Sequence, residues 1–426
     1  MRRHVYFIGV IIAMFGGAAA SAQSTTFRTI GVDTSRAKIP LEEIFSGGPP
    51  PQGIPALGFG GDHNGAAGES PTPQVIPQAE ATWLGDEEPV IVLSLGGKSR
   101  IYPLQILTWH EIVNDTLGGV PVAVTFCPLC NSALAFDRRV PLSEEAAGRV
   151  QKLNPKAKHD SLSEEYLGAY TGQQGEGEVV GGLEVTFGVS GLLYNSNLLM
   201  FDTKSSTLWS QLVGEGVAGS LTGTALLRYP APIVSFAEAR ETYPDAQVLS
   251  RETGFSRAYG RNPYVGYDEI DSPAFLFRGE TDGRLPPKER AVTFEFGAGS
   301  DAEAVAYPFS ALTTERVVND EVGGRPIAVF WEAGTRSALG AGDIADGRDV
   351  GAVNVFERQL NGRALTFSWQ DGAFRDEETG SRWTLLGEAV AGQLTGAQLT
   401  PVVHDNTLWF AWAAFRPETR IYGAAP

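Results

Sequence analysis

The chain has 426 residues, with 50 acidic and 33 basic side chains and a formal net charge of −17 at pH 7. A protein this acidic repels nucleic acids and anionic membrane surfaces, which excludes both as expected partners. Its 51 glycines and 26 prolines favour turns and short strands over long helices, and its length suits two domains or one duplicated domain.

The first 22 residues have the pattern of a secretory signal peptide. Arg2 and Arg3 precede a short apolar run, and Ala20-Ser21-Ala22 is a small-residue cleavage site before Gln23. The run is shorter than the roughly 20 residues that a membrane span needs, and an uncleaved anchor is the alternative. We therefore expect a periplasmic or extracellular protein with no membrane span once it is mature. Cleavage removes two arginines and no acids, so the formal charge becomes −19 (31 − 50).

Residues 23–82 form a Gly- and Pro-rich stretch that predicts a loosely structured arm. Pro103 then suits the first turn of a helix that runs to Asn114, and residues 120–126 are apolar and β-favouring. This expected strand leads directly into Cys127-Pro128-Leu129-Cys130, a knuckle that holds the only two cysteines of the sequence. The knuckle is therefore the first candidate for a chemical site.

Export changes how these two cysteines are interpreted. Thiols outside the cytoplasm tend to pair as disulfides, but a bridge within Cys-x-x-Cys closes a very small loop. Such a bridge would stabilise the fold by only about 2 kcal/mol by loop-closure arithmetic. A purely structural disulfide is therefore one alternative, and a chemically active pair is another.

An internal repeat organises the rest of the chain. The segment that begins at Tyr102 (YPLQILTWHEIVNDTLGGVPVAV) recurs from Tyr307 (YPFSALTTERVVNDEVGGRPIAV), 205 residues later (307 − 102). An Asn361-Gly362 hairpin in the second copy implies that the knuckle of the first copy joins two strands. We therefore predict an α+β, mostly β fold of two tandem related modules packed together.

The predicted boundaries follow from this repeat. Module 1 spans residues 83–249 and carries a polar insertion at 140–182, a connecting segment spans 250–289, and a degenerate module 2 spans 290–426. The connecting segment is rich in aromatic residues and prolines, so we expect it to wrap the surface of the modules.

Positions that differ between the two copies are the functional candidates. His110, Cys127 and Cys130 are replaced by Glu, Glu and Thr at the corresponding positions of the second copy. Met200, the sole methionine of the mature chain, lies in a stretch that the second copy does not retain. Residues that both copies share are instead candidates for the scaffold.

Three classes of function remain open, and a soft-metal site is the leading interpretation. The donor set of Cys127, Cys130, His110 and Met200 suits copper or zinc, with a metal-delivery partner in the envelope. Alternatively, the pair is a redox dithiol with an envelope redox partner, in which Cys127 attacks, Cys130 resolves and His110 lowers the thiol pKa. The third class is a non-catalytic binding module with a local disulfide, whose ligand contacts come from polar and aromatic residues near the knuckle: Trp109, Glu111, Ser190, Asn195 and Asn197.

At these residues the chain resembles the bacterial domain-of-unknown-function 3179 family. The matching segments are IYPLQILTWHEIVND, PVAVTFCPLCNSALAFDR, FGVSGLLYNSNLLMFD, LWSQLVGEGVAG and WFAWAAFRPETRIY, and they span most of residues 83–422. The resemblance implies an exported protein with this knuckle and with the Trp-His-Glu motif at 109–111. It implies no established reaction, and the insertion at 140–182 departs from the shorter hairpin of the family.

Overall fold

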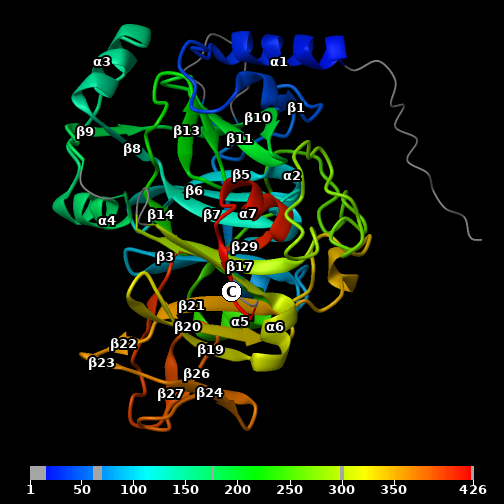
Figure 1. Cartoon of the computed structure of the whole chain (residues 1–426), viewed down its shortest axis with the longest axis vertical. Coiled ribbons are helices and arrows are strands. Elements are labelled where there is room, and N and C mark those ends of the chain that lie inside the picture. The colour runs from blue at the N-terminus through cyan, green and yellow to red at the C-terminus, as the bar shows by residue number, and fades with distance from the viewer. Residues whose placement is uncertain (1–15, 61–69, 175–176, 298–301, 424–426) are drawn as a thin grey trace, which may run out of the picture.

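The computed structural model describes residues 16–60, 70–174, 177–297 and 302–423. Strands account for 37% and helices for 18% of the structure, so the mostly β character is confirmed. The sheets follow one another along the longest axis of the molecule, from the N-terminal helix at one end to a small sheet of the second half at the other (Figure 1).

Within the described residues, the first half builds three sheets of four or five strands. One contains, in spatial order, β15 (Ile233–Ser235), β3 (Pro89–Leu95), β4 (Lys98–Pro103), β16 (Gln247–Leu249) and β2 (Val75–Pro77). The next contains β14 (Arg228–Tyr229), β7 (Ser132–Asp137), β6 (Val120–Cys127) and β5 (Ile112–Leu117). The third contains β1 (Phe45–Ser46), β10 (Phe187–Tyr194), β11 (Asn197–Asp202), β12 (Leu208–Ser210) and β13 (Glu215–Ala218).

The second half builds three four-stranded sheets from its described residues. The first contains β29 (Asp405–Leu408), β17 (Arg290–Phe296), β18 (Glu303–Pro308) and β30 (Arg420–Ile421). The second contains β19 (Val317–Val322), β20 (Arg325–Glu332), β21 (Ala352–Glu357) and β28 (Thr400–Pro401), and the third contains β24 (Phe367–Gln370), β25 (Ala373–Asp376), β26 (Arg382–Trp383) and β27 (Ala389–Ala391). Two-stranded ribbons join β8 (Arg139–Leu142) to β9 (Gly181–Glu184) and β22 (Gln359–Leu360) to β23 (Arg363–Ala364).

Short α-helices connect or cover these sheets: α1 (Gly16–Ile30), α2 (Leu104–His110), α3 (Glu144–Leu153), α4 (Glu164–Gln174), α5 (Phe236–Thr242), α6 (Phe309–Glu315) and α7 (Trp409–Phe415). Single 3₁₀ turns lie at Leu41–Glu43, Gln78–Glu80 and Ile344–Asp346. Among the described residues, no helix combines the length and the apolar character that a membrane crossing requires. Helix α1 continues across the predicted cleavage point after Ala22, and most of the predicted signal peptide lies outside the described residues.

The two halves share the order and direction of their strands. β3 is antiparallel to both β15 and β4, and β16 is parallel to β4. β17, β29, β18 and β30 repeat this arrangement in the second half. A side-chain contact recurs as well. The Tyr102 hydroxyl donates to Asp115 Oδ2 at 2.8 Å, and the Tyr307 hydroxyl donates to Asp320 Oδ2 at 2.7 Å.

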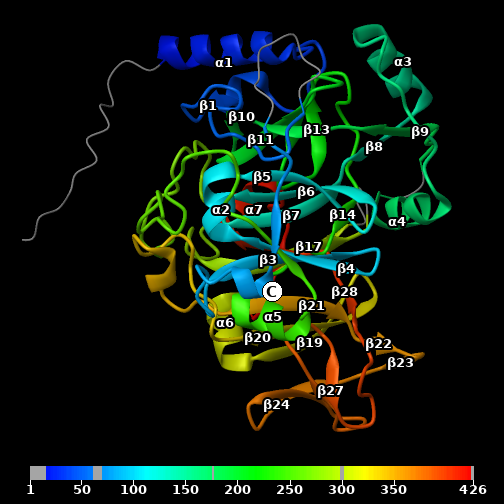
Figure 2. The ribbon, with the colours of Figure 1, turned by 180° about the vertical axis from the view of Figure 1, so that it is seen from behind.

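Each half packs a late helix against the other half. α7 contacts β29 and β17 of its own half and overlaps β5, β6 and β7 of the first half in both views (Figure 1, Figure 2). α5 contacts β15 and β3 of its own half and overlaps β19, β20 and β21 of the second. One apolar cluster joins Val234 and Phe236 to Phe330 of the second half. Another joins Leu408 and Phe410 to the cluster that contains both cysteines. The core is therefore continuous between the halves.

The helix after Pro103 is shorter than predicted, because it ends at His110 and not at Asn114. Glu111 has a φ of 58°, a left-handed conformation that ends a right-handed helix. The chain then enters β5, so the apolar residues beyond His110 belong to a strand. Arg316, with a φ of 64°, ends α6 in the same way.

The arm at residues 23–82 is packed where the structure describes it, in contrast to the loose arm predicted. Phe27, Ile44 and Phe59 are buried, and β1 pairs with β10. Glycine and proline shape the turns between these buried anchors, which is why composition alone suggested a loose segment.

The connecting segment packs against both halves. The amides of Asn262 and Gly266 donate to the carbonyls of Gly342 and Gly340 in the second half. Tyr264, Tyr267 and Phe277 pack against the apolar cluster that contains the cysteines. The insertion at 140–182 carries α3 and α4 and is closed at its base by the pairing of β8 with β9.

Candidate functional site

The cysteine knuckle is a tight turn between two paired strands, as the sequence predicted. Cys127 ends β6 and lies opposite Ser132, the first residue of β7. The Cys130 amide donates to the Cys127 carbonyl at 3.1 Å, and Asn131 completes the turn with a φ of 53°. The turn therefore presents both sulfur atoms from one short loop.

Both cysteines are free thiols, and both are buried, with exposed fractions of 2% for Cys127 and 0% for Cys130. Their sulfur atoms approach the same acceptor, the Ser196 carbonyl, at 3.9 Å and 3.5 Å. Asn197 Nδ2 donates to Cys130 Sγ at 3.6 Å. Burial and the neighbouring Cys127 thiol raise the pKa of Cys130 well above its usual value.

A buried polar network extends from Cys130 to the second half. Asn197 Nδ2 also donates to Gln211 Oε1 at 2.9 Å, and Ser132 Oγ donates to the same oxygen at 3.2 Å. Ser132 Oγ also lies within hydrogen-bond distance of Asp405 Oδ2, and the Ala133 amide donates to Asp405 Oδ1. Burial raises the pKa of the Asp405 carboxyl to about 7, against the lowering effect of these hydrogen bonds.

The C-terminal segment of the second half holds the knuckle backbone in place. The Leu408 amide donates to the Cys130 carbonyl at 2.8 Å, and Thr407 Oγ1 donates to the same carbonyl at 3.0 Å. Asn131 Nδ2 donates to the Asn406 carbonyl at 2.8 Å. The turn that carries the thiols is thus an interface between the two halves.

A buried lysine, Lys288, lies over a tyrosine that contacts the knuckle, and its charge interacts with Cys130. Lys288 is 1% exposed, and its Nζ has no hydrogen-bond partner within the described part of the chain. The ammonium lies 3.0 Å from the ring centre of Tyr267, whose hydroxyl donates to the Leu129 carbonyl in the knuckle. Burial lowers the pKa of Lys288 to about 7, and the charges of Cys130 and Asp268 oppose that shift.

Glu111 is a second buried ionisable group on the same side of the first half. It is 8% exposed, and burial raises the pKa of its carboxyl to about 8. Its carbonyl accepts a hydrogen bond from the Phe126 amide at 2.8 Å, one residue before the knuckle. Burial raises the pKa of Tyr264, and the charges of Glu111 and Cys127 add to that shift.

His110 does not join this group, because both of its ring nitrogens already have partners. Nδ1 donates to the Pro55 carbonyl at 2.7 Å, which leaves Nε2 to accept from the Tyr259 hydroxyl at 2.6 Å. Burial lowers the pKa of His110 to about 4, so the ring is neutral at physiological pH. Trp109 Nε1 donates to the Arg261 carbonyl at 3.1 Å. These two side chains therefore fasten the arm and the connecting segment to α2.

The other predicted ligands divide between the site and the core. Asn197 contacts Cys130, as described above. Ser190 Oγ hydrogen-bonds the Leu199 carbonyl within the sheet, and Asn195 lies in the turn between β10 and β11. Met200 is fully buried and faces Val189 and Trp209 on the neighbouring strands. Across the described residues, no group of three or more His, Cys, Asp or Glu side chains is arranged to hold a metal ion.

Lys288 and Asp405 were not among the residues that the sequence predicted for the site. Strand register places Leu408 at the position that Ser235 has in the first half, so Asp405 corresponds to Pro232. The comparison of copies that marked the cysteines would therefore also have marked Asp405. Lys288 precedes the repeated strand, and only the folded chain brings it to the knuckle.

Fold and site together define a mostly β protein with a buried, unbridged cysteine pair enclosed by both halves of one chain. The chain belongs to the family described as a protein of unknown function, DUF3179, which matches residues 51–419. No match to the chain was found among curated proteins or among solved structures.

Proposed function

We propose that this protein is a thiol–disulfide redox protein of the cell envelope whose active pair is Cys127 and Cys130. The observation that carries the proposal is the pair itself, two unbridged thiols that approach one carbonyl from a single turn. The Cys127 thiolate attacks a partner disulfide, and Cys130 then displaces the partner's second sulfur. The pair loses two electrons and two protons and becomes a disulfide, while the partner disulfide becomes two thiols.

Lys288 supports this chemistry at Cys130. A thiolate forms most readily beside a proton acceptor and a positive charge. With a pKa of about 7, a fraction of Lys288 is uncharged at neutral pH and can accept the Cys130 proton. The resulting ammonium then faces the thiolate, which gives both buried charges a partner. His110 cannot have this role, because its neutral ring already contacts Pro55 and Tyr259.

Access to the pair requires movement of the connecting segment. Two residues of this segment are hydrogen-bonded at the site. The Tyr267 hydroxyl donates to the Leu129 carbonyl in the knuckle, and the Phe275 carbonyl accepts from Ser196 Oγ. The Phe275 side chain is 53% exposed, so a redox partner has an apolar contact on the segment that it must displace. A buried dithiol of this kind reacts only with partners that open the segment.

Binding of a soft metal is the second candidate, and the shared direction of the two sulfur atoms favours it. Thiolates select soft ions such as Cu(I). Zinc sites use three or four protein ligands, and His110 is already engaged on both nitrogens. The cysteine pair therefore suits Cu(I) better than zinc. In this alternative, the partner is a metal-delivery protein. The local disulfide of the third alternative is the oxidised state of the same pair.

We also propose that the two halves are related copies of one module and that only the first retains the site. The common strand order and the repeated Tyr–Asp contact support this relationship. The second copy has Glu332 and Thr335 in place of the cysteines, and it supplies Asp405 to the site of the first.

The two chemical candidates are separated by analysis of the protein as isolated from the envelope fraction. Mass spectrometry after alkylation counts free thiols, and elemental analysis measures copper and zinc on the same sample. The redox proposal predicts a mixture of dithiol and disulfide without stoichiometric metal. One metal ion per chain together with two protected thiols would support the metal candidate instead.

A further inference from the structure

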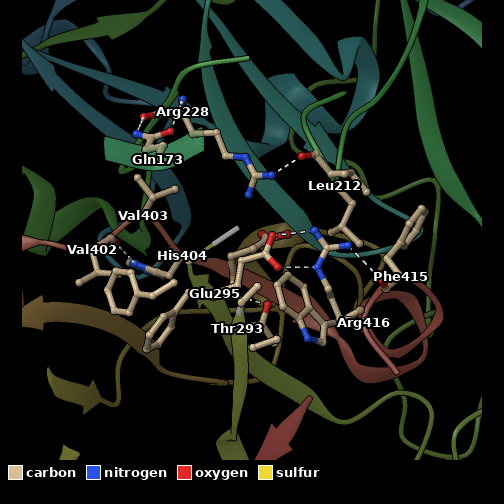
Figure 3. Close-up of a pocket in the computed structure, with 18 of the residues that line it drawn as sticks. Gln173, Leu212, Arg228, Thr293, Glu295, Val402, Val403, His404, Phe415 and Arg416 are labelled. Atoms are coloured by element: carbon tan, nitrogen blue, oxygen red, sulfur yellow. Dashed lines mark hydrogen bonds and ion pairs between the residues drawn. The ribbon is translucent and has the colours of Figure 1, made fainter. Parts of the chain in front are cut away.

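A pocket of about 760 Å³ lies where the two halves and the insertion meet (Figure 3). The first half contributes Leu134 and Leu212 to its walls, and the second half contributes Glu295 and Trp412. Gln173 of α4 brings the insertion to the same wall. Asp405, which bonds the residues after the knuckle, also lines this pocket, so the pocket and the thiol site share one wall.

Three of the four lysines and arginines that line the pocket have a carboxylate partner. These ion pairs are Lys38–Glu215 at 2.6 Å, Arg325–Glu357 at 3.1 Å and Arg416–Glu295 at 2.6 Å. The fourth cation, Arg228, has no carboxylate within 4.0 Å among the described residues. Arg228 is therefore the lining cation without a direct carboxylate contact, and the charges of Glu295, Asp405 and Glu215 act on it only from farther away.

The structure holds Arg228 in a fixed position with part of its guanidinium free. The Gln173 side chain makes two hydrogen bonds to the backbone of Arg228. Gln173 Oε1 accepts from the Arg228 amide at 3.0 Å, and Gln173 Nε2 donates to the Arg228 carbonyl at 2.8 Å. One terminal nitrogen donates to the Val213 carbonyl, whereas Nε has no partner in the described structure. Figure 3 shows the guanidinium directed into the pocket, toward Glu295 and Arg416. Burial lowers the pKa of Arg228, since the charged form loses hydration there.

The rest of the lining suits the body of an organic molecule. Leu134, Leu212, Trp412 and Phe415 offer apolar and aromatic surface. His404 adds a polar ring to the lining, and its Nδ1 contacts the Val402 carbonyl at 2.8 Å. Polar and apolar groups share the lining about equally, so a small molecule could pack its body on the apolar part while a few fixed polar groups orient it.

We propose that this pocket binds a small organic carboxylate, with the carboxylate on Arg228 and the apolar body against the aromatic wall. The planar guanidinium matches a carboxylate in shape and charge. Glu295 and Asp405 line the same space, so a ligand with one negative charge is favoured over a doubly charged phosphate. The insertion would then contribute to ligand binding, because Gln173 holds the backbone of Arg228, the residue that contacts the ligand.

The test is a binding experiment on the full mature chain, with thermal shift and calorimetry as readouts. The probes are benzoate and octanoate, their neutral amides benzamide and octanamide, and inorganic phosphate. At least one carboxylate should raise the melting temperature and bind, while its amide binds at least tenfold more weakly. Arg228→Gln should weaken carboxylate binding at least tenfold. Arg375→Gln, which removes the same charge from β25 outside the pocket, should leave it unchanged.

Gln173→Ala provides a second variant in case Arg228→Gln does not fold, and it should weaken carboxylate binding by loosening Arg228. The proposal is overturned if neither carboxylate binds wild type, if acids and amides bind equally, or if phosphate alone binds. Unchanged affinity in a folded Arg228→Gln protein also overturns it. None of these readouts involves the thiols, so the result stands apart from the redox proposal.

Discussion

The carboxylate of Asp405 accepts a hydrogen bond from Ser132 Oγ, which fastens β29 of the second half to the residue after the cysteine turn of the first. The other oxygen accepts from the Ala133 amide at 2.9 Å. Leu408 and Thr407 then bond the Cys130 carbonyl. The second half is therefore part of the site, although it carries no cysteine.

A fragment of residues 23–249 should not fold as a stable monomer. It lacks the β29 and α7 segment that covers the knuckle, and it exposes the apolar face that Val234 and Phe236 present to Phe330. Each large apolar side chain left exposed costs about 1.5–3 kcal/mol, so a few such exposures offset the roughly 5–15 kcal/mol that stabilise a typical domain. Near-ultraviolet circular dichroism and urea unfolding check this. Cooperative unfolding of the monomeric fragment is the result that contradicts a shared core.

Lys288→Met should make the reduction potential of the cysteine pair more negative by at least about 30 mV. The charge of Lys288 stabilises negative charge on the Cys130 sulfur, which only the reduced pair can carry, and about 1.4 kcal/mol of lost stabilisation corresponds to about 30 mV for two electrons. Methionine fills a similar volume, so folding should be retained. The measurement is equilibration in glutathione buffers. The exposed Lys98→Met variant serves as the charge-matched control and should keep the wild-type potential. An unchanged potential in Lys288→Met removes the lysine from the mechanism.

Glu111→Gln should remove a pH-dependent loss of stability. Burial raises the pKa of Glu111 from 4.5 to about 8, so the folded state binds more protons than the unfolded state between these values. Wild-type stability therefore falls as pH rises through this window, by roughly 2 kcal/mol between pH 6.5 and pH 8 from this group alone. Urea unfolding at both pH values should show a smaller change in Glu111→Gln. Exposed Glu315→Gln is the control, and an equal slope in all three proteins would count against a buried neutral carboxyl.

Much of this fold could be predicted from the sequence, because local patterns and the repeat constrained it. The repeat and the Asn361-Gly362 hairpin correctly placed the knuckle between two strands. The sequence pattern did not predict that the helix ends at His110, because this end depends on the left-handed backbone conformation of Glu111. The buried arm was missed for a related reason, because its glycines and prolines hid the contacts of Phe27 and Phe59.

The candidate site was only partly predictable, because its charged groups come from distant segments. Cys127 and Cys130 stood out as the only cysteines, and Asn197 lay in a segment that the sequence had marked as polar. Lys288 of the connecting segment and Asp405 of the second half come near the knuckle only through tertiary packing. These contacts are long-range in sequence, and no local pattern encodes them.

His110→Ala should destabilise the fold by roughly 2–4 kcal/mol without changing the chemistry of the thiols. The change opens a cavity and leaves the Pro55 carbonyl and the Tyr259 hydroxyl without their shared partner. Urea unfolding measures the loss of stability. The Cu(I) affinity of the reduced variant and the reduction potential of its cysteine pair should both match those of wild type, because the His110 ring takes no part in the proposed thiol chemistry. A tenfold loss of Cu(I) affinity in the folded variant would restore the three-ligand metal site.

If Cys127 and Cys130 form a reversible dithiol, the reduction potential of the protein without its predicted signal peptide has a defined value that redox buffers can reach. The protein is equilibrated in a series of glutathione buffers, alkylated after denaturation and weighed by mass spectrometry, with Cys127→Ser/Cys130→Ser as the blank. We predict a two-electron transition between about −120 and −230 mV, in the range of envelope and glutathione-linked redox proteins. A pair that stays fully reduced in every buffer, or that is oxidised even below about −300 mV like a structural disulfide, contradicts the claim.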